Sequence, residues 1–123
     1  MKALVLVAHG SRRQASNEEV IALSKVIKEQ MVSEYPVIEA GFLELAEPLI
    51  PDAIDQCVKQ GATDVCVVPY FLSAGRHVIT DVPEEVEKAR EMHPEIPMEV
   101  LPHIGGSAMM ISLIQDSVSK RKH

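Results

Sequence analysis

Histidines and a glutamate stand where apolar segments of the sequence end. His9 and Glu44 follow the first two segments directly, and His77 lies just beyond the third. A further histidine, His103, comes shortly after the fourth. In an open sheet of parallel strands, ligands bind outside the carboxyl ends of the strands, so these side chains are expected at one edge. Imidazole and carboxylate groups suit a borderline divalent metal ion and proton exchange near neutral pH, which predicts metal handling or acid–base chemistry there.

The loop after the third apolar segment, "PYFLSAGRH", places apolar side chains at the mouth of the expected sheet. Phe71 and Leu72 stand where a flat hydrophobic ligand could lie, although they could instead cap the core, which we expect of Leu72. Arg12, Arg13 and Arg76 add local positive charge to an acidic chain. Guanidinium groups could hold a polyanionic substrate through paired hydrogen bonds to its carboxylates, whereas a surface arginine is usually only solvated.

The composition disfavours several other classes of function. The 123 residues carry a formal charge of −6 and contain 3% aromatic residues, so neither charge nor stacking favours a nucleic-acid partner. No apolar stretch approaches the roughly 20 residues of a membrane-spanning helix, and no leader cleavage site follows the first run, so we expect a cytoplasmic protein without membrane contact. Cys57 and Cys66 lack the spacing of a zinc site or a disulfide framework, and we expect two buried thiols.

The pattern of apolar residues along the sequence predicts that strands alternate with helices. Continuous apolar runs such as Ala3 to Ala8 are typical of parallel strands covered on both faces. Ser16 and Glu19 have the spacing of a capping box, which predicts that a helix begins there. Pro83 lies inside a helical pattern that could begin as early as His77, so this helix could be broken. The expected strands are 3–8, 37–43, 65–68 and 96–101, and the expected helices are 16–33, about 48–60, 81–94 and 109–118.

Four strands alternating with four helices predict an α/β fold. We expect a parallel four-stranded sheet with helices on both faces, joined by right-handed crossovers. No linker, low-complexity segment or long repeat divides the sequence, so residues 1–123 are expected to form a single domain.

Three segments carry a resemblance to a known family. They are "LVAHGSR", "GFLELAEPLIPDAI" and "GATDVCVVPYFLSAGRHVITDVP", which together span about two-thirds of the chain. The sequence resembles the short form of the sirohydrochlorin chelatases, the CbiX/SirB group of class II chelatases. The resemblance implies a chelatase-like domain equal to half of a two-lobed class II chelatase, and therefore a homodimer. It also implies an enzyme, a lyase without a nucleotide cofactor, that inserts Co²⁺, Fe²⁺ or Ni²⁺ into sirohydrochlorin on the routes to cobalamin, sirohaem and coenzyme F430.

The resemblance also implies roles for particular residues. His9 and His77 match the family's metal-binding and catalytic histidines, and Glu44 matches the acid of its "FLE" segment. The macrocycle must lose two pyrrole protons as the ion enters, so we expect the histidines to present the metal and accept protons, with Glu44 as ligand or base. A role for His103 stays open. The residues expected to contact the tetrapyrrole are Gly10, Ser11, Arg12, Phe71, Leu72 and Arg76, with Arg13 as a further candidate for its carboxylates.

Two alternatives remain at this point. A histidine followed by glycine after the first strand is also typical of histidine phosphatases, where the histidine is the phosphoryl nucleophile. Those enzymes carry an arginine immediately before the histidine, whereas this sequence has Ala8, so the anion-binding partner is missing. The other alternative is a protein of the same fold that binds metal or tetrapyrrole without turnover. Because metal affinities follow the Irving–Williams order, the ligand types leave cobalt, iron and nickel open.

Overall fold

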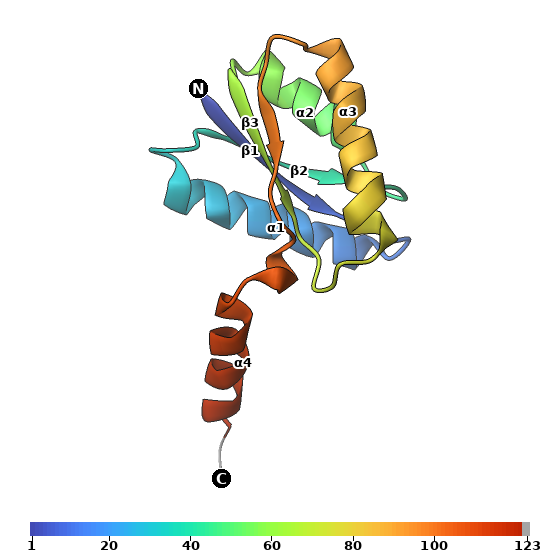
Figure 1. Cartoon of the computed structure of the whole chain (residues 1–123). Helices are drawn as coiled ribbons and strands as arrows, with labels where there is room; N and C mark the ends of the chain where they lie inside the picture. The colour runs from blue at the N-terminus through green and yellow to red at the C-terminus, as the bar shows by residue number, and fades with distance from the viewer. Residues whose placement is uncertain (122–123) are drawn as a thin grey trace.

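Strands and helices alternate along most of the chain. The computed structural model describes residues 1–121, apart from the side chain of His77. The elements shown in Figure 1 are β1 (Lys2–Ala8), α1 (Gln14–Met31), β2 (Val37–Phe42), α2 (Ile50–Lys59), β3 (Asp64–Pro69), the π-helical turn η1 (His77–Asp81), α3 (Val82–Met92), β4 (Met98–Val100), the 3₁₀ turn η2 (Ile104–Gly106) and α4 (Met109–Ser119).

The four strands form one parallel sheet in the order β2-β1-β3-β4, which confirms the predicted fold class. β1 is central, with Ala3 opposite Val37 of β2 and opposite Val65 of β3. The residues from Ala3 to Ala8 are all buried, as expected for a strand covered on both faces. The strand order reverses at β1 and β3, and the ends of such strands are where open α/β sheets bind ligands.

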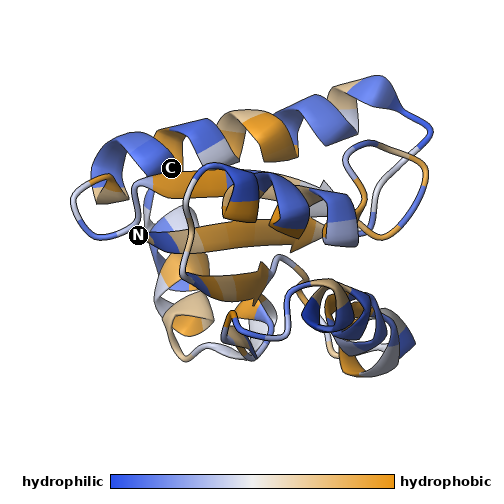
Figure 2. Cartoon of the chain, turned by 90° about the horizontal axis from the view of Figure 1, so that it is seen from above, coloured by the Kyte–Doolittle hydropathy of each residue, from blue (hydrophilic) through white to orange (hydrophobic). Residues whose placement is uncertain are grey.

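Helices cover the two faces of the sheet unequally. α1 packs on one face, against the cluster of Leu4, Leu6 and Ile38. α2 and α3 pack against each other on the opposite face, where Ile54 and Val86 join the larger core cluster. Figure 2 shows the strands as a mainly hydrophobic layer and the helices as a mixture of hydrophilic and hydrophobic residues. The aliphatic side chains of the sheet therefore form the middle of the domain.

α1 begins earlier than the capping-box pattern predicts. It starts at Gln14, after Arg13, without a side-chain cap, and Ser16 lies inside its first turn. The prediction that the helix begins at Ser16 is therefore wrong. The reason is that the buried Asn17 side chain bonds to the backbone of Ser11 and so fixes the chain that enters the helix.

The segment before α3 is helical but not broken. The turn His77–Asp81 is π-helical and runs directly into α3. Pro83 lies in the first turn of α3, where the helix needs no donor from that residue, so the predicted break does not occur. β4 is shorter than the expected 96–101, although the Pro97 carbonyl and the Leu101 N–H still bond to β3.

α4 leaves the body of the domain and points away from the sheet (Figure 1). None of its residues is buried, so α4 does not join the helical layers in which the patterning places it.

The cysteines differ in their surroundings. Cys57 is fully buried, as expected, and its burial raises the pKa of its thiol to about 12. Cys66 on β3 is only half-buried, so the prediction of two buried thiols is wrong for this residue. Within residues 1–121, no helix combines the length and apolar composition needed to cross a membrane.

Candidate active site

His9 and Glu44 meet at the carboxyl edge of the sheet. The pairing of β1 with β2 continues past the strands, because the Glu44 N–H bonds to the His9 carbonyl at 3.1 Å. The side chains then face each other, with 3.7 Å between His9 Nε2 and Glu44 Oε1. The exposed fractions are 41% for the His9 side chain and 53% for that of Glu44, although the His9 Nε2 atom itself is buried. This edge therefore offers an imidazole and a carboxylate within reach of one ion.

Gly10 allows the two strand ends to approach each other. Its φ of +94° lies in the left-handed region that glycine adopts without strain. A Cβ atom at this position would overlap the backbone carbonyl of Glu44. A side chain at Gly10 would therefore push apart the loops that carry the His9 and Glu44 side chains.

Asn17, which the sequence patterns do not single out, bonds to the loop that follows His9. Its side chain accepts a hydrogen bond from the Ser11 N–H at 2.9 Å and donates one to the Ser11 carbonyl at 2.7 Å. Only 4% of Asn17 is exposed. A polar residue in the helical phase of the apolar Val20 is the signal that could have identified it. Asn17 thus connects the first turn of α1 to the loop that follows His9.

His77 is placed by its backbone alone. It opens the turn η1 after β3, and its side chain lies outside the described part of the structure. Its partnership with His9 and Glu44 therefore stays a prediction. Among the side chains that the structure describes, no three from histidine, cysteine, aspartate and glutamate gather as a metal site. The described chain thus supplies a pair of potential ligands to which a third would have to be added.

The loop after β3 forms an apolar hollow. Tyr70, Phe71, Leu72 and Ile104 line a pocket of about 220 Å³. Phe71 packs against the core, whereas Leu72 is 74% exposed, so the expectation that Leu72 caps the core is wrong. The reason lies in the backbone, since Gly105 packs closely against the main chain of Leu72 and its N–H bonds to the Phe71 carbonyl.

The expected anion-binding arginines lie on the surface. Arg12, Arg13 and Arg76 are all exposed, and within residues 1–121 none of their guanidinium groups forms an ion pair. His103 lies just before η2, with its ring packed against Gly106.

Glu44 also lines an acidic pocket of about 190 Å³. The other lining residues are Leu43 and three acids at the start of α3, namely Asp81, Glu84 and Glu85. Clustered carboxylates in a concave site raise the local concentration of cations. The Glu44 side of the site is therefore suited to the approach of a metal ion.

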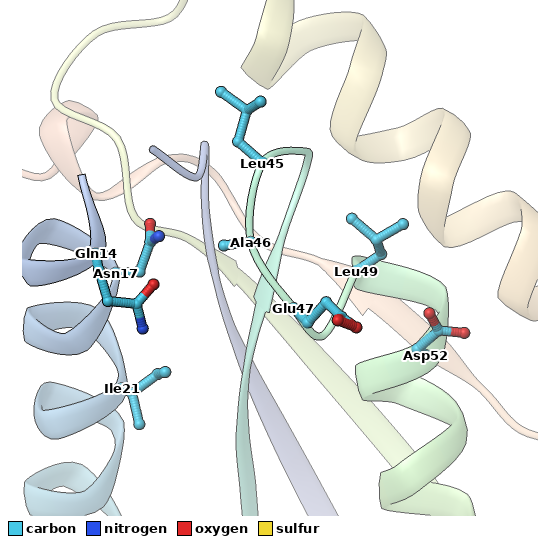
Figure 3. Close-up of a pocket in the computed structure, with 8 residues that line it drawn as sticks. All are labelled: Gln14, Asn17, Ile21, Leu45, Ala46, Glu47, Leu49 and Asp52. Atoms are coloured by element: carbon cyan, nitrogen blue, oxygen red, sulfur yellow. The ribbon is translucent and has the colours of Figure 1, made fainter. Parts of the chain in front are cut away.

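A further pocket, of about 600 Å³, lies between α1 and the loop that leads from β2 into α2 (Figure 3). Its volume is within the range of roughly 300–1,000 Å³ that small-molecule sites occupy. Sequence patterning does not locate it, because it depends on how the loop folds over the sheet. It is lined by Gln14, Asn17, Ile21, Leu45, Ala46, Glu47, Leu49 and Asp52.

Comparison with known families decides the affiliation of this fold. The sequence model of the CbiX family matches residues 3–121. The chain belongs to the CbiX family. This CbiX-family chain is 41% identical over 93 residues to a sirohydrochlorin cobaltochelatase of Methanocaldococcus jannaschii, a match that covers 76% of the chain and 64% of that relative. It is 36% identical over 115 residues to the chloroplastic sirohydrochlorin ferrochelatase of Arabidopsis thaliana, covering 94% of the chain and 50% of that relative.

A solved structure shows the same arrangement of strands and helices. The sirohydrochlorin chelatase SirB of Bacillus subtilis subspecies spizizenii, in complex with cobalt, superposes with a TM-score of 0.86 at 34% identity. The superposition covers 97% of the CbiX-family chain and 50% of that structure. The chain therefore spans about half the length of several of the proteins it matches.

Proposed function

We propose that this chain inserts a divalent metal ion into sirohydrochlorin at the sheet edge where His9 and Glu44 meet. The observation that carries the proposal is the 3.7 Å approach of His9 Nε2 to Glu44 Oε1 on adjacent parallel strands. Relatives named as sirohydrochlorin cobaltochelatase and ferrochelatase support the choice of substrate. The cobalt complex of the Bacillus subtilis chelatase SirB supports a metal ion as the second substrate.

The residues of the pair suit the chemistry of insertion. A tetrapyrrole loses two N–H protons as the ion enters, so the site needs a loosely held metal ion and a proton acceptor. His9 and Glu44 hold the ion from one side, and the exposed faces of both groups leave room for the macrocycle. His77 completes the ligand set from the segment after β3. As the ion passes to the macrocycle, the imidazoles of His9 and His77 are released from it and accept the two pyrrole protons.

The surroundings separate the two substrates by charge and polarity. The acidic pocket beside Glu44 attracts the metal ion, because its other charged residues are carboxylates. The apolar hollow that contains Phe71 and Leu72 supports the macrocycle. The edge of the macrocycle contacts the backbone of the loop at Gly10 and Ser11. The exposed Arg12, Arg13 and Arg76 pair with the carboxylates of the ring.

Several finer features belong to the same proposal. The enzyme acts as a homodimer, is cytoplasmic and uses no nucleotide. Its metal substrate is Co²⁺ or Fe²⁺, as the names of the relatives suggest, with Ni²⁺ as the remaining candidate, and its product enters cobalamin, sirohaem or coenzyme F430 synthesis.

The test is an anaerobic absorbance time course of sirohydrochlorin with Co²⁺, Fe²⁺ or Ni²⁺. Spectral conversion above the protein-free rate with at least one ion is the expected result, and the relative rates rank the metals. Conversion that never exceeds the protein-free rate with any ion contradicts the proposed function.

A further inference from the structure

β2 forms one edge of the sheet, and one side of its backbone faces away from the other strands. The strand order places β2 beside β1 alone. Along a strand, the backbone N–H and C=O groups of residues two apart point to the same side. The Phe42 N–H points outward, because it bonds to the Pro48 carbonyl at 2.9 Å. The backbone groups of Ile38 and Ala40 therefore point outward as well.

These outward groups have limited access to solvent and no partner in the described chain. Only 5% of Ile38 and 6% of Ala40 is exposed. Within residues 1–121, neither a loop nor a side chain bonds to their N–H or C=O groups. A row of unpaired backbone groups at a sheet edge is a template for a further strand. The chain already uses this template at one end, where Leu49 forms a parallel bridge to Phe42.

A groove of about 230 Å³ runs along this edge between β2 and α1. Its helix side is formed by residues three or four apart, which lie on one face of α1. Over seven residues a helix rises about 10 Å, the length of about three residues of an extended chain. The β2-edge groove is defined here by Ile21, Ser24, Lys25 and Lys28 of α1 and by Ile38 and Ala40 of β2.

The helix side of the β2-edge groove is basic, whereas the opposite face of β2 is acidic. Lys25 is exposed and Lys28 is half-buried, and in the described chain neither ammonium group forms an ion pair. On the other face, the Glu39 carboxylate accepts a hydrogen bond from Gln60 at the end of α2. Opposite charges on neighbouring strands stabilise a sheet and like charges destabilise it. A further strand should therefore place acidic side chains over α1 and uncharged ones over α2.

We propose that the β2-edge groove binds an extended acidic segment of a partner protein, which adds a fifth strand to the sheet beside β2. The backbone of the segment pairs with the outward N–H and C=O groups of Ile38 and Ala40. Every second side chain of the segment faces α1, where aspartate or glutamate meets Lys25 and Lys28. In this mode of recognition the main-chain hydrogen bonds supply affinity and the alternate side chains supply specificity.

A second copy of the chain fits the β2-edge groove less well than an acidic segment does. Two β2 strands related by a two-fold axis would pair Ile38 of one copy with Ala40 of the other. The two Glu39 residues would then lie directly opposite each other, which is destabilising for like charges. The basic sides of the two α1 helices would also face each other. The charges therefore favour a segment of opposite sign.

The proposal is tested with a defined probe, a capped hexapeptide that alternates glutamate with threonine, titrated into the ¹⁵N-labelled full chain. Threonine favours an extended conformation and carries no charge. In the free protein, the amides of Ile38 and Ala40 should exchange hydrogen faster than that of Glu39, which points toward β1. Adding the peptide should slow exchange at Ile38 and Ala40, and a hexapeptide that alternates lysine with threonine should not.

Two results of this titration would overturn the proposal. The first is an unchanged exchange rate of the Ile38 and Ala40 amides at saturating peptide. The second is a free protein in which these amides are already as protected as that of Glu39. Such protection, with a mass of more than one chain that falls to one chain when Glu39→Arg blocks the edge, would mean that a second copy occupies the groove.

Backbone pairing is separated from charge by two N-methylated versions of the glutamate peptide. One version carries methyl groups on the glutamate nitrogens and the other on the threonine nitrogens, so each removes the donors on one side of the added strand. One version should bind like the parent peptide and the other should fail, and the version that fails gives the direction of the strand. Equal binding of both versions, or loss of binding in both, would contradict pairing along one side.

The charge contribution is tested by reversing the lysines of the groove. Lys25→Glu should weaken binding of the glutamate peptide by about three- to tenfold, because a surface ion pair is replaced by repulsion. Lys88→Glu, the same reversal on the exposed surface of α3, is the matched control and should leave the affinity unchanged. The double variant Lys25→Glu with Lys28→Glu should bind the lysine peptide instead. Equal weakening by Lys25→Glu and Lys88→Glu would assign the effect to net charge and contradict the groove.

Peptide docking and metal insertion are separate properties, because the β2-edge groove shares no residue with the pair of His9 and Glu44. Thermal melts of the lysine variants should match that of the natural sequence, since both lysines lie on the surface side of α1. A chain that inserts metal and binds no peptide contradicts only the docking proposal. A chain that binds the peptide and inserts no metal contradicts only the proposed function.

Discussion

At the scale of single residues, the site depends on how closely two strand ends approach. The His9 and Glu44 side chains face each other because the backbone pairing of β1 and β2 continues to these residues. Gly10 makes this possible, since a side chain there would occupy the position of the Glu44 carbonyl. The geometry of the candidate site therefore depends on Gly10, which has no side chain, as well as on His9 and Glu44.

The His9→Ala variant should lose metal insertion while keeping its fold. Removing a positioned proton acceptor typically lowers a rate by roughly 100- to 10,000-fold. His9 is half-exposed and outside the core clusters, so the melting temperature should stay close to that of the natural sequence. The measurement is the anaerobic insertion rate beside a thermal melt. His93→Ala, a histidine that contacts Asp55 at the far end of α3, is the control, and equal loss in both variants would remove His9 from the mechanism.

The Gly10→Ala variant should lower both stability and the insertion rate. Forcing a side chain into a left-handed backbone position costs about 1–3 kcal/mol, and the clash with Glu44 adds to this. Urea denaturation measures the free energy of unfolding. Gly75→Ala is the matched control, because a Cβ at Gly75 meets no atom within 4 Å and its φ is not in the left-handed region. Equal stabilities of the two variants would show that Gly10 has no such restriction.

At the scale of elements, α1 is both a layer of the fold and a support for the site. Its apolar side chains pack on β1 and β2, and its first turn carries Asn17, which holds the loop at Ser11 through two hydrogen bonds. The capping-box pattern at Ser16 and Glu19 uses only local sequence. It could not show that a side chain one position later bonds to the preceding loop, which is a tertiary contact.

The Asn17→Ala variant tests this support. Losing both hydrogen bonds leaves partly buried groups of the Ser11 backbone without these partners, which should lower stability by about 1 kcal/mol and also lower the insertion rate. Ser24→Ala is the control within the same helix, since Ser24 is equally buried but bonds only to the Ile21 carbonyl of its own helix. Its insertion rate should equal that of the natural sequence. An unchanged insertion rate in Asn17→Ala would show that the support of the loop at Ser11 does not contribute to catalysis.

Asp55 of α2 contacts Lys59 in its own helix and His93 at the end of α3, and these contacts predict a pH dependence. Asp55 contacts Lys59 at 3.0 Å and His93 at 3.1 Å. The hydrogen bond from Lys59, and then that from His93, lower the pKa of Asp55 below its usual value of 3.8. The folded pKa is therefore below the unfolded pKa, so the contribution to stability is present above 3.8 and is lost as the pH falls through the folded value.

Asp55→Asn should accordingly be less stable than the natural sequence at neutral pH. The difference should shrink when both proteins are denatured with urea at a pH well below 3.8, because Asp55 is then protonated in the folded state as well. A difference between the two proteins that is independent of pH would assign the effect to packing instead of charge.

At the scale of the whole molecule, the sequence predicts the strands and helices whose apolar residues recur at a regular spacing. It leaves open which surface each of these elements packs against. Buried runs such as Ala3 to Ala8 identify parallel strands, so the sheet and the shared edge of His9 and Glu44 follow from the pattern. The apolar residues of α4 show that one helix face needs cover, but periodicity carries no information about which surface provides it. The expectation that Leu72 caps the core failed for a related reason, since periodicity does not show that the Leu72 backbone lies against the distant Gly105 while its side chain is exposed.

The most direct test of the account is whether the protein turns over. Sirohydrochlorin and metal ion are supplied in large excess over protein under anaerobic conditions, and the amount of metallated product is counted for each chain. The account predicts many product molecules per chain, with turnover lost in His9→Ala. Product that stops at one molecule per chain, or that forms no faster than without protein, would contradict catalysis and identify a protein that only binds metal or tetrapyrrole.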